Sequence, residues 1–79
     1  MEAETAFGIV LRELRKRRAL SQEALAYEAE LERNYISLLE LGRNSASVKT
    51  VFKLAAALGV SVTEFMGMVE AKANERTRE

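Results

Sequence analysis

Four side chains between residues 33 and 38 have the chemistry needed to read the edges of base pairs. They are Arg33, Asn34, Ser37 and Leu38. Arginine donates two hydrogen bonds to guanine, asparagine pairs bidentately with adenine, serine bonds several bases, and an apolar side chain contacts the thymine methyl group. Residues three and four apart lie on the same face of a helix. We therefore interpret these four residues as one face of a helix that contacts bases.

The residues before this face predict the element that positions it. Residues 22–41 read as two short helices joined by about three residues, and such a pair crosses steeply. A steep crossing needs a small residue where the helices touch, which Ala26 supplies, and apolar residues beside the turn, which Leu31, Ile36 and Leu39 supply. The outer face of the second helix then stays free. In this helix-turn-helix arrangement, the start of the second helix enters the major groove of DNA.

Apolar residues recur at helical spacing along the rest of the chain and predict an all-α fold of five helices. We expect helices over residues 5–18, from Ser21 onward, over 33–41, over 48–58 and from Ser61 onward. Thr5, Ser21, Ser47 and Ser61 are suitable N-caps, and Glu64 completes a capping box with Ser61. Gly42 and Gly59 are placed to end the third and fourth helices. Val48, Val51, Ala55 and Leu58 are expected to form the buried stripe of the fourth helix.

The length of the chain, 79 residues, predicts one domain over residues 1–79. We expect its packed core to cover about residues 5–71, followed by a frayed polar tail at 72–79. No apolar run is long enough to span a bilayer, and the acidic N-terminus lacks the apolar region of a signal peptide. A cytoplasmic protein that does not contact membranes is therefore expected.

The composition argues against catalysis. The chain has neither Cys nor His, so thiol nucleophiles, thiolate metal sites and the commonest general base are missing. Its serines have no His to activate them, and no Gly-rich loop is present to hold a phosphate. We expect no enzyme activity, no metal and no cofactor.

The formal net charge is zero, which argues mildly against a nucleic-acid partner. The charges are unevenly distributed, however. Basic residues crowd at Arg12 and 15–18, and further ones follow at Arg33, Arg43, Lys49 and Lys53. A neutral chain with this distribution can present one positive face to phosphates.

Four segments together resemble the phage-repressor-like (XRE-type) helix-turn-helix family. They are Leu-Ser-Gln-Glu-Ala-Leu-Ala (20–26), Arg-Asn-Tyr-Ile-Ser (33–37), Leu-Glu-Leu-Gly-Arg (39–43) and Lys-Leu-Ala-Ala-Ala-Leu-Gly-Val-Ser (53–61). The resemblance covers about residues 7–66. Within this family, residues 31–37 and the Gly-Arg-Asn that follows are similar to controller proteins of restriction–modification systems.

This resemblance implies roles for the matching positions. The base-reading residues would be Arg33, Asn34, Ser37 and Leu38. Phosphates would be bound by Gln22, Tyr35, Arg43, Asn44 and Lys49. Arg15 and Glu40 match a pair that links the first helix to the third. The family also implies a homodimer on two half-sites of double-stranded DNA, about one helical turn apart.

The sequence departs from the family pattern at three positions. Glu30 stands where the turn usually has Gly, and a left-handed conformation there would cost roughly 1 kcal/mol or more. Glu32 replaces the usual Ser, Thr or Asp cap of the third helix. Leu38 stands where controller proteins often have Gly, so the base preference is expected to differ.

The fifth predicted helix has apolar residues on more than one side, and exposed apolar patches usually mark contacts. Val62, Met66, Met68 and Val69 are the expected dimer interface. A homodimeric transcriptional regulator on a near-palindromic operator is the leading hypothesis. Repression by blocking RNA polymerase and activation by contacting it both stay open, as does control of a restriction–modification operon. The alternative is a protein-binding module of the antitoxin or antirepressor type.

Overall fold

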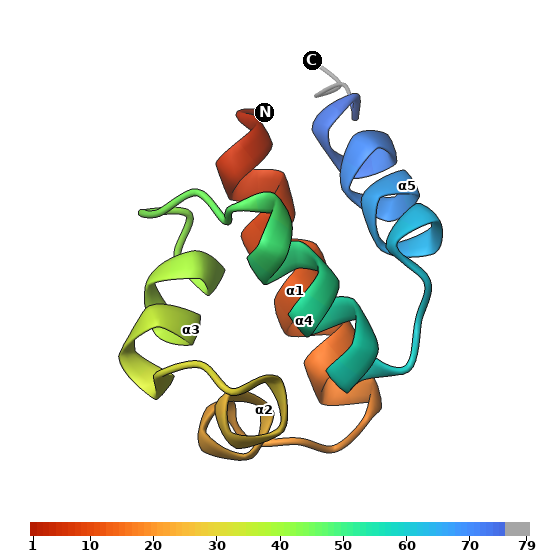
Figure 1. Cartoon of the computed structure of the whole chain (residues 1–79). Helices are drawn as coiled ribbons and strands as arrows, with labels where there is room; N and C mark the ends of the chain where they lie inside the picture. The colour runs from red at the N-terminus through yellow and green to blue at the C-terminus, as the bar shows by residue number, and fades with distance from the viewer. Residues whose placement is uncertain (76–79) are drawn as a thin grey trace.

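The computed structural model describes residues 1–75, and in this range the chain forms five helices and no strand. They are α1 (Ala3–Arg17), α2 (Gln22–Ala29), α3 (Arg33–Glu40), α4 (Val48–Leu58) and α5 (Val62–Ala73). In Figure 1, α4 lies in front of α1, with α3 and α5 on opposite sides and α2 below. The all-α class and the central helix-turn-helix expected from the sequence are confirmed.

One hydrophobic core is built from side chains of all five helices. Its largest fully buried side chains come from every helix: Val10, Leu11, Leu25, Ile36, Leu39, Leu54 and Phe65. The rings of Phe7 and Phe65 stack with centroids 5.1 Å apart, which fixes α1 against α5. Because α1 also packs against α3, it is the support that sets the position of the helix-turn-helix.

Serine caps define three of the helix starts as predicted. The hydroxyls of Ser21, Ser47 and Ser61 accept hydrogen bonds from the backbone N–H three residues later, and Glu64 completes the capping box. These bonds satisfy backbone donors that an α-helix leaves unpaired at its first turn.

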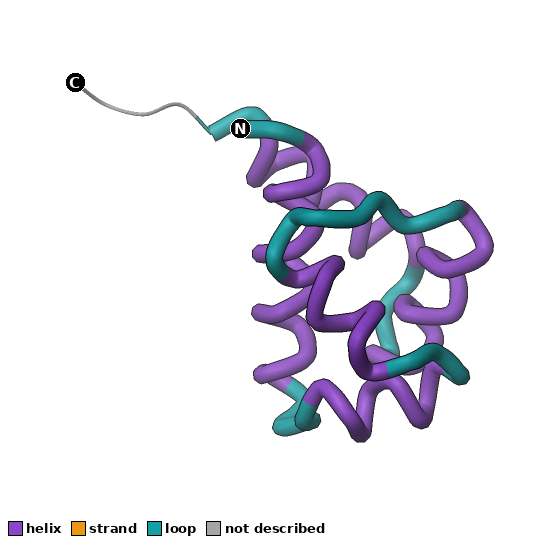
Figure 2. Tube along the Cα trace, turned by 90° about the vertical axis from the view of Figure 1, so that its left-hand side faces the viewer, coloured by secondary structure: helices purple, strands orange, loops and turns teal. Residues whose placement is uncertain are grey.

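Both ends of the chain differ from the prediction. Helix α1 begins at Ala3, so Thr5 lies inside the helix, and Glu2 occupies the cap position without a side-chain bond. Lys72 and Ala73 are helical rather than frayed, and the N-terminal ammonium of Met1 donates to the Ala73 carbonyl at 3.1 Å. Figure 2 shows these two ends side by side. The rest of the predicted tail, residues 76–79, lies outside the described residues.

The apolar stripe predicted for α4 is wrong at its first position. Val51, Ala55 and Leu58 are buried as expected, but Val48 is 74% exposed. Val48 is in the first turn of α4, beyond the point where neighbouring helices cover it, and Phe52 one turn later is also exposed. An apolar side is therefore left open on this helix.

No single helix among residues 1–75 is long and apolar enough to cross a membrane. Only α4 and α5 taken together reach the necessary length and composition, and they are bent by 106° relative to each other.

Candidate nucleic-acid interface

The turn between α2 and α3 sets the direction of α3. Glu30 has φ 58° and ψ 47°, so this non-glycine residue does adopt the left-handed conformation. The next residue, Leu31, donates its backbone N–H to the Ala26 carbonyl at 2.8 Å and closes the turn. Ala26 is buried at the crossing, and Leu31 is half-buried against the core. The tight turn is therefore retained without glycine, at the cost of a strained left-handed backbone at Glu30.

Helix α3 buries Ile36 and Leu39 and leaves its opposite side open. Arg33 and Asn34, in its first turn, are exposed, whereas Ser37 and Leu38 are half-buried. The four residues assigned to base reading thus share the side of α3 that faces away from the core. Glu32, which precedes α3, is exposed and makes no side-chain capping bond. The exposed start of α3 therefore carries the carboxylate of Glu32 beside the guanidinium of Arg33 and the amide of Asn34.

A buried network joins α3 to α1 and α2. Arg15 donates from Nε to Glu40 Oε2 at 2.6 Å and from Nη2 to Oε1 at 2.9 Å, and its Nη1 bonds the Leu20 carbonyl at 2.9 Å. The side chains of Arg15 and Glu40 are only 9% and 4% exposed. The hydrogen bond to Glu40 raises the pKa of Arg15, so the guanidinium stays charged in the folded chain. This bidentate pair holds the last turn of α3 against α1.

Gln22 belongs to the same network. Its Nε2 donates to Glu40 Oε1 at 3.0 Å, so the first residue of α2 is tied to the last residue of α3. From sequence we assigned Gln22 to a phosphate, and the contact with Glu40 was missed. An amide nitrogen has a second N–H. The phosphate role therefore stays compatible with this bond, which orients the side chain.

The other residues assigned to phosphates lie around the loop between α3 and α4. Arg43, Asn44 and Lys49 are exposed, and Tyr35 is half-buried. The hydroxyl of Tyr35 donates to the Ser45 carbonyl at 3.4 Å, and the Ser45 hydroxyl bonds Glu4 at 3.2 Å. These two bonds connect the loop to α3 on one side and to α1 on the other.

The basic run at residues 15–18 is not one uniform surface. Arg15 is buried in the network, and Arg18 donates to the Ala57 carbonyl at 3.3 Å. Lys16 and Arg17 are exposed at the end of α1. Two of the four cations thus serve contacts within the chain.

The four residues assigned to a dimer interface differ in how far they are exposed at the surface. Val69 is 4% exposed and belongs to the core, so its assignment to a surface contact is corrected. Val62 and Met68 are half-buried against the core, and Met66 is 38% exposed. The apolar stripe of α5 faces mainly inward because it covers Phe7 and the rest of α1. The sequence reading missed the exposed apolar side chains of α4.

Comparison with known proteins places this fold and site in a class. A helix-turn-helix family model matches residues 11–65, which cover the two crossing helices, α4 and the start of α5. The chain therefore belongs to the XRE-type helix-turn-helix family and is a DNA-binding transcriptional regulator.

Its relatives include controllers of restriction–modification systems. The chain is 37% identical over 65 residues to the control protein C.MunI of a Mycoplasma species, covering 81% of this chain and 88% of that protein. The restriction–modification controller C.AhdI of Aeromonas hydrophila has a similar structure, with a TM-score of 0.77 and 40% identity over 78% of this chain and 94% of that one. The clp gene regulator ClgR of Corynebacterium glutamicum shares the fold at a TM-score of 0.88 and 25% identity, with 96% and 99% coverage.

Proposed function

We propose that this protein is a homodimeric regulator that binds a near-palindromic operator and controls a restriction–modification operon in the cytoplasm. It acts by binding, without catalysing a reaction. The observation that carries the proposal is the open side of α3. Arg33 and Asn34 protrude at its start while the Arg15–Glu40 network holds its other end. The similarity to C.MunI and C.AhdI supports the restriction–modification context.

Rigid support is what base reading requires. Hydrogen bonds to base edges discriminate only when donors reach the groove in a fixed register, which contacts to phosphates provide. Here Gln22 at the start of α2 and Arg43, Asn44 and Lys49 after α3 flank the reading helix on both sides. We assign phosphate contacts to these residues and to Tyr35, and base contacts to Arg33, Asn34, Ser37 and Leu38.

A homodimer follows from the small size of this reading surface. One α3 presents four side chains, which specify only a few base pairs. Two copies related by a two-fold axis would read two half-sites about 34–36 Å apart, one turn of DNA. Occupancy of such a site blocks RNA polymerase when it overlaps the promoter, and offers polymerase a surface when it lies upstream.

Selection of bound duplexes from a random library at physiological salt tests this function. We expect an enriched site with two-fold symmetry and half-site centres about 10 base pairs apart. An enriched site without symmetry would contradict the dimer. No enrichment over the starting library would contradict sequence-specific binding and would favour a protein-binding module.

A further inference from the structure

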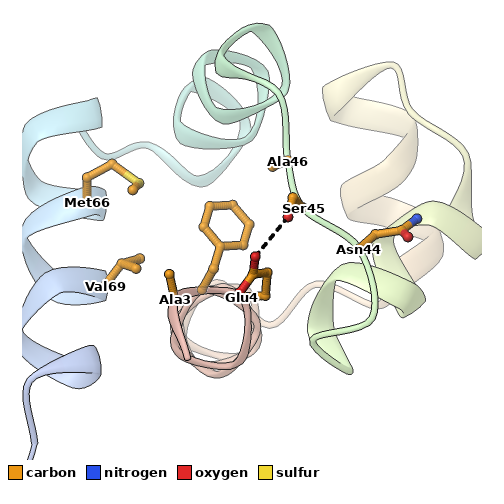
Figure 3. Close-up of a pocket in the computed structure, with 8 residues that line it drawn as sticks. Ala3, Glu4, Asn44, Ser45, Ala46, Met66 and Val69 are labelled. Atoms are coloured by element: carbon orange, nitrogen blue, oxygen red, sulfur yellow. Dashed lines mark hydrogen bonds between the residues drawn. The ribbon is translucent and has the colours of Figure 1, made fainter. Parts of the chain in front are cut away.

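The carboxylate of Glu32 stands at the exposed start of α3 without a partner in the part of the chain that the structure describes. Glu32 holds the N-cap position, but its side chain accepts no capping hydrogen bond. It also forms no salt bridge with any described residue. Carboxylates elsewhere do find donors. Figure 3 shows Glu4 bonded to the hydroxyl of Ser45, and Glu40 accepts two bonds from α1. The carboxylate of Glu32 is therefore free to bind a group outside the chain.

Glu32 stands where a shorter polar residue would stabilise the fold. Serine hydroxyls close the first turns of α2, α4 and α5, and glutamate is not among the residue types that cap helices well. Departures from such local rules are expected at functional sites. Here the departure falls directly before Arg33 and Asn34, which are both exposed. In zinc fingers, too, the residue just before the groove-binding helix contacts a base. The position of Glu32 therefore points to a role in binding.

A carboxylate beside the reading face meets two opposite influences on DNA. Phosphates repel it, and a carboxylate that leaves water without meeting a hydrogen-bond donor is costly. The bases offer donors in the major groove only at the amino groups of cytosine N4 and adenine N6. Adenine presents its N7 acceptor beside the amino group, which repels a carboxylate and suits an amide such as Asn34. Cytosine presents the amino group alone, so it is the base that a glutamate matches best.

We propose that Glu32 determines specificity by accepting a hydrogen bond from the N4 amino group of one cytosine in each half-site. This inference rests on the proposed function, because it requires that α3 reads bases. Consecutive Cα atoms lie about 3.8 Å apart and stacked base pairs about 3.4 Å apart. The cytosine therefore lies within about one base pair of the position that Arg33 reads. A guanine–cytosine pair presents the guanine acceptors next to this amino group, so a guanidinium and a carboxylate side by side match its edge.

Dissociation constants of Glu32→Ala test this contact on the duplex that the selection yields. The wild-type chain should bind this duplex about tenfold more tightly, per half-site, than duplexes in which another base pair replaces the symmetric cytosine. Glu32→Ala should bind the selected duplex more weakly and should lose this preference alone. On random DNA the same variant should bind more tightly than the wild type, because a charge that phosphates repel is gone. These opposite effects are the signature of a contact to a base.

Glu28→Ala is the matched control, because it removes an exposed carboxylate four residues earlier, on α2. It should change the affinity for every duplex by the same factor. Glu32→Ser is a second variant. A serine at this position should cap α3 and raise the midpoint of thermal unfolding, yet it should lose the cytosine preference as Glu32→Ala does. A residue that acted only through the stability of the fold would not separate these two readouts.

Chemical modification of the base tests the bonded atom itself. N4-methylcytosine still pairs with guanine but carries a methyl group in place of the N–H that faces the major groove. At the symmetric cytosines this modification should weaken wild-type binding by about tenfold per half-site and leave Glu32→Ala unaffected. The same modification at a cytosine outside the half-sites should leave both proteins unaffected.

These outcomes separate the proposal from the proposed function. An enriched site with no cytosine within one base pair of the position that Arg33 reads would overturn the role of Glu32 and leave sequence-specific binding intact. An equal change of affinity on every duplex for Glu32→Ala would show a general electrostatic or structural effect and would also overturn it. Equal sensitivity of the wild type and Glu32→Ala to N4-methylcytosine would overturn it as well. Only the absence of any enriched site would overturn both.

Discussion

Replacing Glu40 with Ala is expected to lower the free energy of unfolding by about 3–5 kcal/mol, because it leaves a buried guanidinium without its partner. Arg15 is buried with Glu40, and a guanidinium keeps its proton in proteins, so Arg15 cannot escape the cost by losing its charge. The change also removes the acceptor for Gln22. Urea unfolding followed by circular dichroism measures the loss.

Two control variants identify the cause of this loss. Glu28→Ala removes an exposed carboxylate from α2 and should change stability by less than about 0.5 kcal/mol. The double variant Arg15→Met with Glu40→Leu removes both charges and should be more stable than Glu40→Ala alone, since apolar residues of similar volume often replace buried pairs without loss. A loss below about 1 kcal/mol for Glu40→Ala would contradict the structural role of this network.

Gly8→Ala is expected to destabilise the fold, although alanine is the better helix former by about 1 kcal/mol. A Cβ atom at Gly8 would lie 2.5 Å from the Leu39 carbonyl oxygen and 2.6 Å from that of Glu40. These are backbone atoms of α3, so α1 and α3 would have to move apart. We expect a loss of about 2–3 kcal/mol, at the upper end of overpacking effects, measured by thermal and urea unfolding.

Gly67 provides the matched control for this substitution. It lies inside α5, and apart from its chain neighbours and the backbone of the same helix, no described atom is within 4 Å of the position that a Cβ would take. Gly67→Ala should therefore stabilise the chain by about 0.5–1 kcal/mol. Opposite signs for the two substitutions are the expected result. A stabilising Gly8→Ala would show that α1 and α3 do not approach as closely as described.

Local signals in the sequence predicted most of the fold. Ser21, Ser47 and Ser61 cap helices where expected, because a hydroxyl that bonds the backbone three residues later acts within one turn. The start of α1 at Ala3 was missed because its cap residue, Glu2, is not one of the residue types that usually cap helices. Its side chain makes no capping hydrogen bond.

Features that depend on tertiary contacts were harder to predict. Spacing alone cannot separate Val69, which covers the core, from Met66, which is partly exposed on the same helix. Periodicity also placed Val48 in the core stripe, because the pattern does not show where a neighbouring helix ends. The bond from Gln22 to Glu40 joins residues 18 positions apart, and no local pattern predicts it.

The candidate reading face was easier to find, because residue type and turn position together limit its location. The structure places Arg33 and Asn34 on the exposed start of α3 as the spacing indicated, and leaves Ser37 and Leu38 half-buried. Whether these side chains contact bases stays a prediction.

One binding measurement tests base reading by α3 most directly. Dissociation constants of the wild-type chain and of Arg33→Ala are compared on the selected duplex and on duplexes that change one symmetric base pair at a time. We predict that Arg33→Ala costs about 1–3 kcal/mol per half-site and no longer distinguishes one base-pair position that the wild type reads. An equal loss of affinity on every duplex, random DNA included, would show that Arg33 contacts only phosphate and would contradict the account.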